Sequence, residues 1–190
     1  MKRLIVGISG ASGAVYGVRL LQVLKDLPEI ETHLIISQAA RQTLALETDF
    51  KLREVTALAD VNHDIRDIAA SISSGSFRST GMVILPCSMK TLSGIANSYT
   101  DDLLTRAADV ILKERRTLVL CVRETPLHLG HLKLMTQAAE MGAVIMPPMP
   151  AFYHRPQSIG DVIDQTVNRV LDQFDIELPK DLFQRWQGQS

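Results

Sequence analysis

Hydrophobic residues in this chain gather in five short runs, separated by longer stretches of mixed character. The runs cover residues 4–9, 32–37, 82–86, 117–122 and 143–147. They are nearly continuous and do not alternate with polar residues, which is typical of parallel strands that are buried on both faces. Each run is therefore predicted to be an interior strand of one sheet.

The stretches between the runs have the period of a helix. Helices are predicted over residues 13–27, 38–48, 101–115, 127–141 and 159–174. Strands that alternate with helices in this way predict an α/β fold, with a doubly wound parallel sheet between two helical layers. Residues 50–77 show no clear period and are predicted to be helix and loop.

Length, charge and cysteine content narrow the possible functions. A chain of 190 residues fits one domain spanning 1–190, and its net charge of −1 is spread without a basic stripe for nucleic acid. Gly and Ser interrupt the first apolar run, and no run is long enough to span a membrane, so a cytoplasmic location is expected. In that reducing compartment the only two cysteines, Cys87 and Cys121, are expected to be free thiols.

The first strand runs into GISGASG, in which glycines 7, 10 and 13 alternate with serines 9 and 12. Small residues allow backbone N–H groups to approach an anion, and the helix that follows contributes a favourable dipole. The spacing matches neither GxGxxG nor a P-loop, so a terminal monophosphate fits better than a dinucleotide. A tight turn without a ligand is the alternative.

Other strands also end in polar residues, at the edge where such sheets bind ligands. Ser37 ends the second strand as a helix cap or a ligand contact, and Ser88 and Thr91 follow the third. Arg123, after the fourth strand, can pair with an anion or form a surface ion pair. Cys87 lacks an activating neighbour and is not expected to be a nucleophile.

Several charged residues lie on predicted helices or loops. Arg106 and Lys113 share one helix face and lie four residues after Asp102 and Asp109, so spacing favours a solvated face with i,i+4 ion pairs. Arg169 lies at the edge of an apolar stripe, where spacing leaves its direction open. His128 and His131 have too few neighbouring ligands for a metal site, and no metal is expected.

Five blocks of the sequence together resemble the UbiX-like flavin prenyltransferase family. They are GISGASG, LETDF at 46–50, PCSMKTLSGIANSYTDDLLTRAADV, LVLCVRETPLHLGHL and MPPMPAFYHRP, and they cover nearly the whole chain. The resemblance implies a flavodoxin-like (Rossmann-like) fold. It also implies transfer of a dimethylallyl group from dimethylallyl phosphate to reduced FMN, which makes prenylated FMN for UbiD-type decarboxylases, as in ubiquinone biosynthesis. The family forms homo-oligomers, typically dodecamers.

The resemblance assigns roles to residues at matching positions. The FMN-binding set is Gly10, Ala11, Ser12, Ser37, Ser88, Met89, Lys90, Thr91 and Arg123. The set for dimethylallyl phosphate is Arg106, Lys113, Tyr153 and Arg169, with contributions from a neighbouring subunit, which replaces the solvated-face interpretation of Arg106 and Lys113. The catalytic set is Ser12, Glu47, Lys113 and Trp186.

Two other functions remain as alternatives. Flavin-dependent cysteine decarboxylases share this fold, but they use a histidine closer to the proline of the third block, whereas the nearest preceding histidine here is His63, 23 residues before Pro86. An FMN-binding electron carrier would not need the anion-binding set of Lys113, Tyr153 and Arg169.

Overall fold

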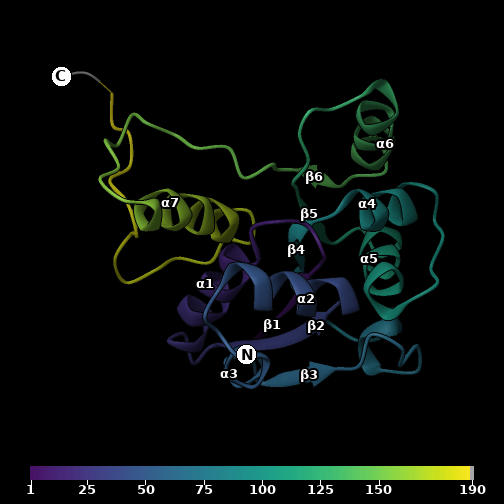
Figure 1. Ribbon diagram of the computed structural model, residues 1–190. Coiled ribbons are helices and arrows are strands. Elements are labelled where there is room, and N and C mark those ends of the chain that lie inside the picture. Colours follow the sequence, from purple (N-terminus) through teal and green to yellow (C-terminus); the bar gives the residue numbers. More distant parts are fainter. Residues whose placement is uncertain (189–190) are drawn as a thin grey trace.

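Six parallel strands form a single sheet that is covered by helices on both faces (Figure 1). The computed structural model describes residues 1–188. The order across the sheet is β3-β2-β1-β4-β5-β6. The strands are β1 (Lys2–Ile8), β2 (Ile30–Ile36), β3 (Val61–His63), β4 (Gly81–Cys87), β5 (Thr117–Val122) and β6 (Val144–Ile145).

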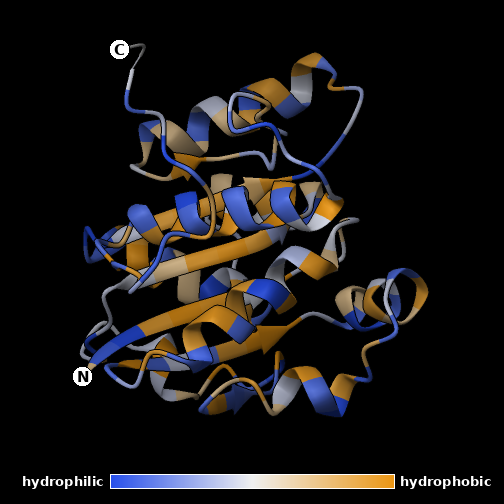
Figure 2. Ribbon diagram, turned by 90° about the vertical axis from the view of Figure 1, so that its left-hand side faces the viewer, coloured by the Kyte–Doolittle hydropathy of each residue, from blue (hydrophilic) through white to orange (hydrophobic). Residues whose placement is uncertain are grey.

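Successive residues of a buried strand point to opposite faces, so each face of the sheet has its own core. Leu4, Val6 and Ile8 of β1 pack toward α1, α2 and α7, whereas Ile5 packs with α4, α5 and α6 on the other face. Figure 2 shows the strands as largely hydrophobic, between helices of mixed character. The helices are α1 (Ala14–Lys25), α2 (Gln38–Glu47), α3 (Leu52–Thr56), α4 (Met89–Ala96), α5 (Leu103–Lys113), α6 (Leu129–Glu140) and α7 (Ile159–Asp172), with a 3₁₀ turn at Ser71–Ser73.

The predicted α/β fold is confirmed, and all five predicted strands and five predicted helices are present. Without β3, the strands follow the order β2-β1-β4-β5-β6. Renumbered along the chain, this is 2-1-3-4-5, the flavodoxin-like order, to which β3 adds an edge strand beside β2. The last strand is shorter than predicted. It ends at Ile145 because Pro147 and Pro148 have no N–H group with which to continue the ladder.

Two elements were not predicted. Helix α4 begins directly after β4, where Thr91, Ser93 and Gly94 give a weak helical signal, but the Ser88 hydroxyl accepts the Thr91 N–H at 3.3 Å and caps its start. Strand β3 lies within residues 50–77, for which only helix and loop were predicted. It has three residues, too few for a recognisable pattern.

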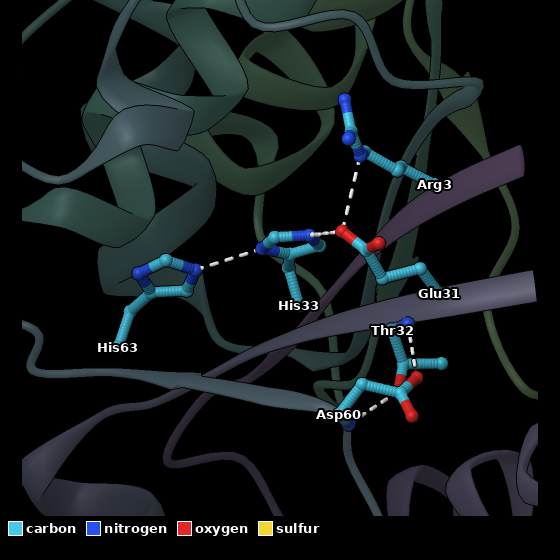
Figure 3. Close-up of polar contacts among 6 residues, drawn as sticks. All are labelled: Arg3, Glu31, Thr32, His33, Asp60 and His63. Carbon is cyan, nitrogen blue, oxygen red and sulfur yellow. Dashed lines mark hydrogen bonds and ion pairs between the residues drawn. The ribbon is translucent and has the colours of Figure 1, made fainter. Parts of the chain in front are cut away.

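Side-chain contacts hold the short edge strand in place (Figure 3). His33 Nδ1 and His63 Nε2 share a hydrogen bond of 2.9 Å between β2 and β3, and His33 Nε2 lies 2.7 Å from Glu31 Oε1. Asp60, just before β3, accepts hydrogen bonds from the N–H and the hydroxyl of Thr32 at 2.7 and 2.9 Å. A polar network therefore compensates for the small apolar area of β3.

Helix α7 packs beside α1, and Arg19 of α1 forms an ion pair with Asp164 of α7 at 2.6 Å. Ser158 and Asp161 form the predicted capping box at the start of α7. After α7 the chain folds back over it without regular secondary structure. Within residues 1–188, no helix combines the length and the apolar character needed to cross a membrane.

Candidate active site

The carboxyl ends of β1 and β4 meet where the direction of winding reverses, which is where doubly wound sheets bind ligands. Ser9 joins these two ends. Its buried hydroxyl donates to the Pro86 carbonyl at 2.8 Å and accepts the Ser88 N–H at 2.7 Å. The sequence showed Ser9 only as one small residue among several, because its partners lie 77 and 79 residues away.

A groove of about 720 Å³ opens beside this junction. Ser37 lies in its wall and caps α2 by accepting the Ala40 N–H at 3.0 Å, so the predicted capping role is confirmed. Ser88 and Thr91 also line the groove, and their hydroxyls lie 3.1 Å apart. The lining residues are Gly10, Ser37, Gln38, Ala39, Gln42, Ile65, Arg66, Ser88, Lys90, Thr91, Asp101 and Asp102.

Gly10 allows the loop after β1 to approach α2 closely. A Cβ atom at Gly10 would lie 2.4 Å from Ala39 Cβ, so only glycine fits there without a shift of the helix. Hydroxyls, a lysine and helix N-termini are donors suited to a phosphate and a polyhydroxy chain, and the volume suits a mononucleotide. Of the FMN-binding set, Gly10, Ser37, Ser88, Lys90 and Thr91 line the groove, whereas Met89 packs partly against the core.

Glu47 occupies the start of α1. Its Oε2 accepts the N–H groups of Gly13 at 2.8 Å and Ala14 at 3.4 Å, and its carboxylate is hydrogen-bonded to the Ser12 side chain. The anion at this helix start is thus a carboxylate of the chain itself, whereas the sequence predicted that the glycine loop binds a monophosphate. Two predicted catalytic residues, Ser12 and Glu47, are in contact.

Charge and hydrogen bonding set the protonation of Glu47. Burial raises the pKa of the Glu47 carboxyl, but hydrogen bonds from Ser12, Gly13 and Ala14, together with the charge of Arg123, outweigh burial and hold the pKa below its ordinary value. Glu47 is therefore a carboxylate at neutral pH, and it acts as a hydrogen-bond acceptor. Arg123, just after β5, contributes its positive charge to this group.

Cys87 is enclosed in the core at the end of β4. Burial raises the pKa of the Cys87 thiol far above its ordinary value, and burial raises that of Cys121 to about 12. Both cysteines are free, as predicted. A buried, protonated thiol is a poor nucleophile, and Cys87 was not expected to be one.

Arg106 and Lys113, the two predicted substrate-binding cations of α5, lie apart from the glycine loop and Glu47 in the sequence. Helix α5 starts after Asp102, which lines the groove at the carboxyl ends of the strands. The helix runs back toward Thr117, the first residue of β5, at the amino ends of the strands. Its 11 residues span about 16 Å, so Lys113 at its last position lies far from the groove wall where the helix starts. Lys113 forms an ion pair with Glu114 and lies close to Gly75.

The predicted i,i+4 ion pairs of α5 are wrong. Asp102 instead caps the helix by accepting the Thr105 N–H at 2.8 Å, and Arg106 pairs with Asp109 at 2.9 Å. Asp102 is unavailable to Arg106 because capping directs its carboxylate toward the free N–H groups of the first turn.

A third group of predicted residues lies around α7 and the C-terminal segment. The rings of Tyr153 and Trp186 have centroids 6.3 Å apart and line one cavity of about 1090 Å³. Arg169, near the end of α7, forms an ion pair with Asp172 at 2.8 Å. Phe174, just beyond α7, packs against Gly81 at the start of β4. This end of α7 therefore also lies at the amino ends of the strands, away from the groove.

The two histidines after β5 form no metal-binding group with other ligands. The rings of His128 and His131 have centroids 3.5 Å apart, and His128 Nδ1 accepts the Gly130 N–H at 3.0 Å to cap α6. In the described chain, residues 1–188, no three His, Cys, Asp or Glu side chains gather in a way that could hold a metal ion.

The fold and the groove define a mononucleotide-binding α/β protein. The model of the Flavoprotein family matches residues 1–171. Over 188 residues, the chain is 84% identical to the flavin prenyltransferase UbiX of Escherichia coli (strain K12), covering 99% of this chain and 100% of that relative. The chain belongs to the Flavoprotein family and, within it, to the UbiX flavin prenyltransferases.

Solved structures agree with this assignment. The crystal structure of AnUbiX (PadA1) in complex with FMN and dimethylallyl pyrophosphate superposes with a TM-score of 0.94 at 50% identity, covering 100% of this chain and 99% of that one. A dodecameric FMN-dependent UbiX-like decarboxylase from Escherichia coli O157:H7 also gives a TM-score of 0.94, at 53% identity, covering 98% of this chain and 100% of that one.

Proposed function

We propose that this chain transfers the dimethylallyl group of dimethylallyl phosphate to reduced FMN, releasing phosphate and prenylated FMN. The observation that carries the proposal is the contact between Ser12 and Glu47 beside a hydroxyl-lined groove, in a chain that matches a flavin prenyltransferase over its whole length. Reduced FMN, when bound, supplies the nucleophilic ring atoms that receive the prenyl group.

The groove residues hold the cofactor. Ser37, Ser88 and Thr91 would hold FMN through their hydroxyls, and Lys90 would add a positive charge near its phosphate. Backbone groups of Gly10 and Ala11 in the glycine loop, and Arg123 just after β5, would complete the binding of the flavin. Met89 supports this wall from the core side.

Departure of phosphate from an allylic carbon develops negative charge on the phosphate and positive charge on the prenyl group. Arginine and lysine donors stabilise the phosphate, which is the role of Arg106, Lys113 and Arg169. The ring faces of Tyr153 and Trp186 stabilise the cationic prenyl carbon. Glu47, as a carboxylate, accepts the Ser12 hydroxyl proton in a hydrogen bond and orients this hydroxyl for proton transfer at the flavin.

The active site is composite. Lys113 and Arg169 lie toward the amino ends of the strands, whereas Ser12 and Glu47 lie at the carboxyl ends, which supports a site completed by more than one chain. We assign the complete site to contacts between copies of the chain in a homo-oligomer, for which the dodecamer of the UbiX-like relative is the model. Each copy contributes its flavin groove to one site and its α5 or α7 cations to another.

Mass spectrometry of the flavin tests the activity. The protein is incubated without oxygen with reduced FMN and dimethylallyl phosphate, and the flavin is then extracted. The expected product carries the mass of one added isoprene unit, and its formation releases one inorganic phosphate. Unmodified FMN after complete incubation would refute prenyl transfer, whereas release of carbon dioxide from a peptide with a C-terminal cysteine would favour the decarboxylase alternative.

Subunit mixing tests the composite site. Ser12→Ala and Lys113→Ala homo-oligomers are each expected to be nearly inactive. If the residues act from different copies, co-refolded oligomers contain some sites with both native residues and regain activity. If Ser12 and Lys113 act from the same copy, mixing restores nothing. Arg53→Ala, on the exposed helix α3, is the matched control that should leave activity unchanged when mixed in the same way.

The proposal extends to the setting of the enzyme. Residues 1–190 act as one FMN-binding domain in the cytoplasm, where Cys87 and Cys121 stay reduced. The product serves a UbiD-type decarboxylase. Co-purification of prenylated FMN with such a decarboxylase, expressed together with this chain but not with its Ser12→Ala variant, tests this link.

A further inference from the structure

One carboxylate at the end of α7 contacts two arginines from different parts of the chain. Asp172 Oδ2 accepts a hydrogen bond from Arg169 Nη1 at 2.8 Å and from Arg185 Nη1 at 3.0 Å. Its Oδ1 accepts from Arg185 Nη2 at 2.8 Å, so the Arg185 contact is bidentate. The Asp172 side chain is only 20% exposed. It therefore connects Arg169 to the C-terminal segment.

Further contacts fix the segment that carries Arg185. Arg185 Nε donates to Asp181 Oδ2 at 2.7 Å. Asn168, buried within α7, accepts the Leu182 N–H through its Oδ1 at 2.8 Å. Residues 177–188 have no helix or strand of their own, so these polar contacts, together with the packing of Leu178 and Leu182 against the core, hold the segment in place.

The segment places aromatic rings around one cavity. Phe183 packs near Tyr153, with ring centroids 6.4 Å apart, and Trp186 packs near the same ring at 6.3 Å. Tyr153, Arg185 and Trp186 all line the cavity of about 1090 Å³. Trp186 directly follows Arg185 in the chain, so its position depends on how Arg185 is held.

Asp172 also leaves Arg169 able to bind an anion. A guanidinium has five N–H donors in a fixed plane, and Arg169 uses only Nη1 toward Asp172. That contact restrains one end of the guanidinium, and the donors on Nε and Nη2 form no hydrogen bond with Asp172. The pKa of Asp172 lies below its ordinary value, mainly because of the hydrogen bonds from Arg185, so the carboxylate is charged at neutral pH.

We propose that Asp172 is a positioning residue for prenyl transfer, which orients the Arg169 guanidinium and, through Arg185, holds Trp186 opposite Tyr153. This inference rests on the proposed function, in which Arg169, Tyr153 and Trp186 contact the prenyl substrate. Asp172 itself touches neither the substrate nor the flavin. Its role is to couple the phosphate-binding arginine to the aromatic wall.

The single tryptophan of the chain gives a readout that does not depend on activity. Asp172→Asn keeps the shape of the side chain but removes its charge. In the full chain free of flavin, we expect Trp186 fluorescence in this variant to become more accessible to acrylamide and lower in anisotropy. Asp175→Asn is the matched control, because Asp175 lies three residues away with a positive φ of 51° that asparagine tolerates.

Kinetics provide the second readout. We expect Asp172→Asn to bind FMN as the wild type does but to lose about tenfold or more in kcat/KM for dimethylallyl phosphate, because misplaced binding groups act strongly on the transition state. Arg185→Gln frees the segment but leaves Arg169 paired, so it should lose less than Asp172→Asn. Asp172→Glu restores the charge and should recover part of the loss.

The two readouts separate the possible failures. Unchanged Trp186 quenching in Asp172→Asn would overturn the proposal, whatever the activity. Greater quenching with wild-type prenyl transfer would also overturn it, because the contact would then be merely structural. If the wild-type chain itself transferred no prenyl group, the proposed function would fail, and with it the catalytic part of this inference, while the quenching result would still decide whether Asp172 holds the segment.

Discussion

Gly10→Ala is expected to push the glycine loop away from α2 and to weaken both the fold and the flavin groove. The new Cβ would lie 2.4 Å from Ala39 Cβ and 3.3 Å from the Ala39 carbonyl carbon. Neither atom belongs to a flexible side chain, so the backbone must shift. Overpacking of this kind costs about 1–3 kcal/mol, which lowers Tm by about 2–12 °C in a domain of this size.

A double-mutant cycle isolates this contact. Ala39→Gly removes the opposing Cβ, although glycine in a helix costs about 1 kcal/mol by itself. If the two changes were independent, the double variant would be the least stable. Because Ala39→Gly relieves the overlap, we expect Gly10→Ala/Ala39→Gly to be more stable than Gly10→Ala, with a coupling free energy of at least about 1 kcal/mol.

Urea unfolding and FMN titration measure the two effects. Gly10 lines the groove with Ser37 and Ser88, so we expect Gly10→Ala to raise the Kd for FMN about tenfold, or ~1.4 kcal/mol. Gly160→Ala is the control, since its Cβ would meet only Ser158 Oγ, at 3.4 Å. Wild-type stability and FMN affinity in Gly10→Ala, or an additive cycle, would refute the reasoning.

Three further predictions concern a thiol, a histidine and an arginine. Burial raises the pKa of the Cys87 thiol, so Cys87→Ala should keep prenyl transfer and native Cys87 should resist iodoacetamide at pH 8; an inactive variant that still binds FMN would contradict this. Burial, followed by the charge of His33, lowers the pKa of His63 despite an opposing effect of Asp67. The unfolded chain therefore binds protons at a higher pH than the folded chain, and the free energy of unfolding should fall as the pH drops below about 6.5. In His63→Gln, the free energy of unfolding, measured with urea, should fall less between pH 8 and pH 5.5 than in the wild type. An equal fall would exclude His63 as the source of the pH dependence. Arg169→Ala should slow prenyl transfer about a hundredfold with unchanged FMN affinity, and Arg169→Lys should recover part of the rate; a wild-type rate would remove Arg169 from the phosphate site.

Apolar runs predicted the central strands well because burial on both faces leaves a strong local signal. The runs at 4–9 and 117–122 correspond to β1 and β5, which lie in the core. Strand β3 has no such signal, since its three residues are held by partners distant in the chain, such as His33 for His63. Helix α4 depends on a cap and on packing, which local propensity underestimates.

Within the candidate site, too, some residues have a signal in the local sequence and others do not. Ser37 and Ser88 were predicted from their places at strand ends, because the topology of a doubly wound sheet brings those ends together. Glu47 came only from the family resemblance, because it meets Gly13 across 34 residues and no local pattern marks that contact. The links from Asp172 to Arg185 and from Asn168 to Leu182 were not predicted, since the C-terminal segment has no periodic pattern to place it.

Spacing alone favoured a solvated face for Arg106 and Lys113, while the family resemblance gave them a substrate. In the structure each cation pairs with a nearby carboxylate, Arg106 with Asp109 and Lys113 with Glu114, and the substrate role stays a prediction. Exposed ion pairs of this kind contribute only about 0–1 kcal/mol, so exchanging the carboxylate for a substrate phosphate costs little. The same cations can therefore lie in solvent on one chain and remain available to an anion that a neighbouring copy presents.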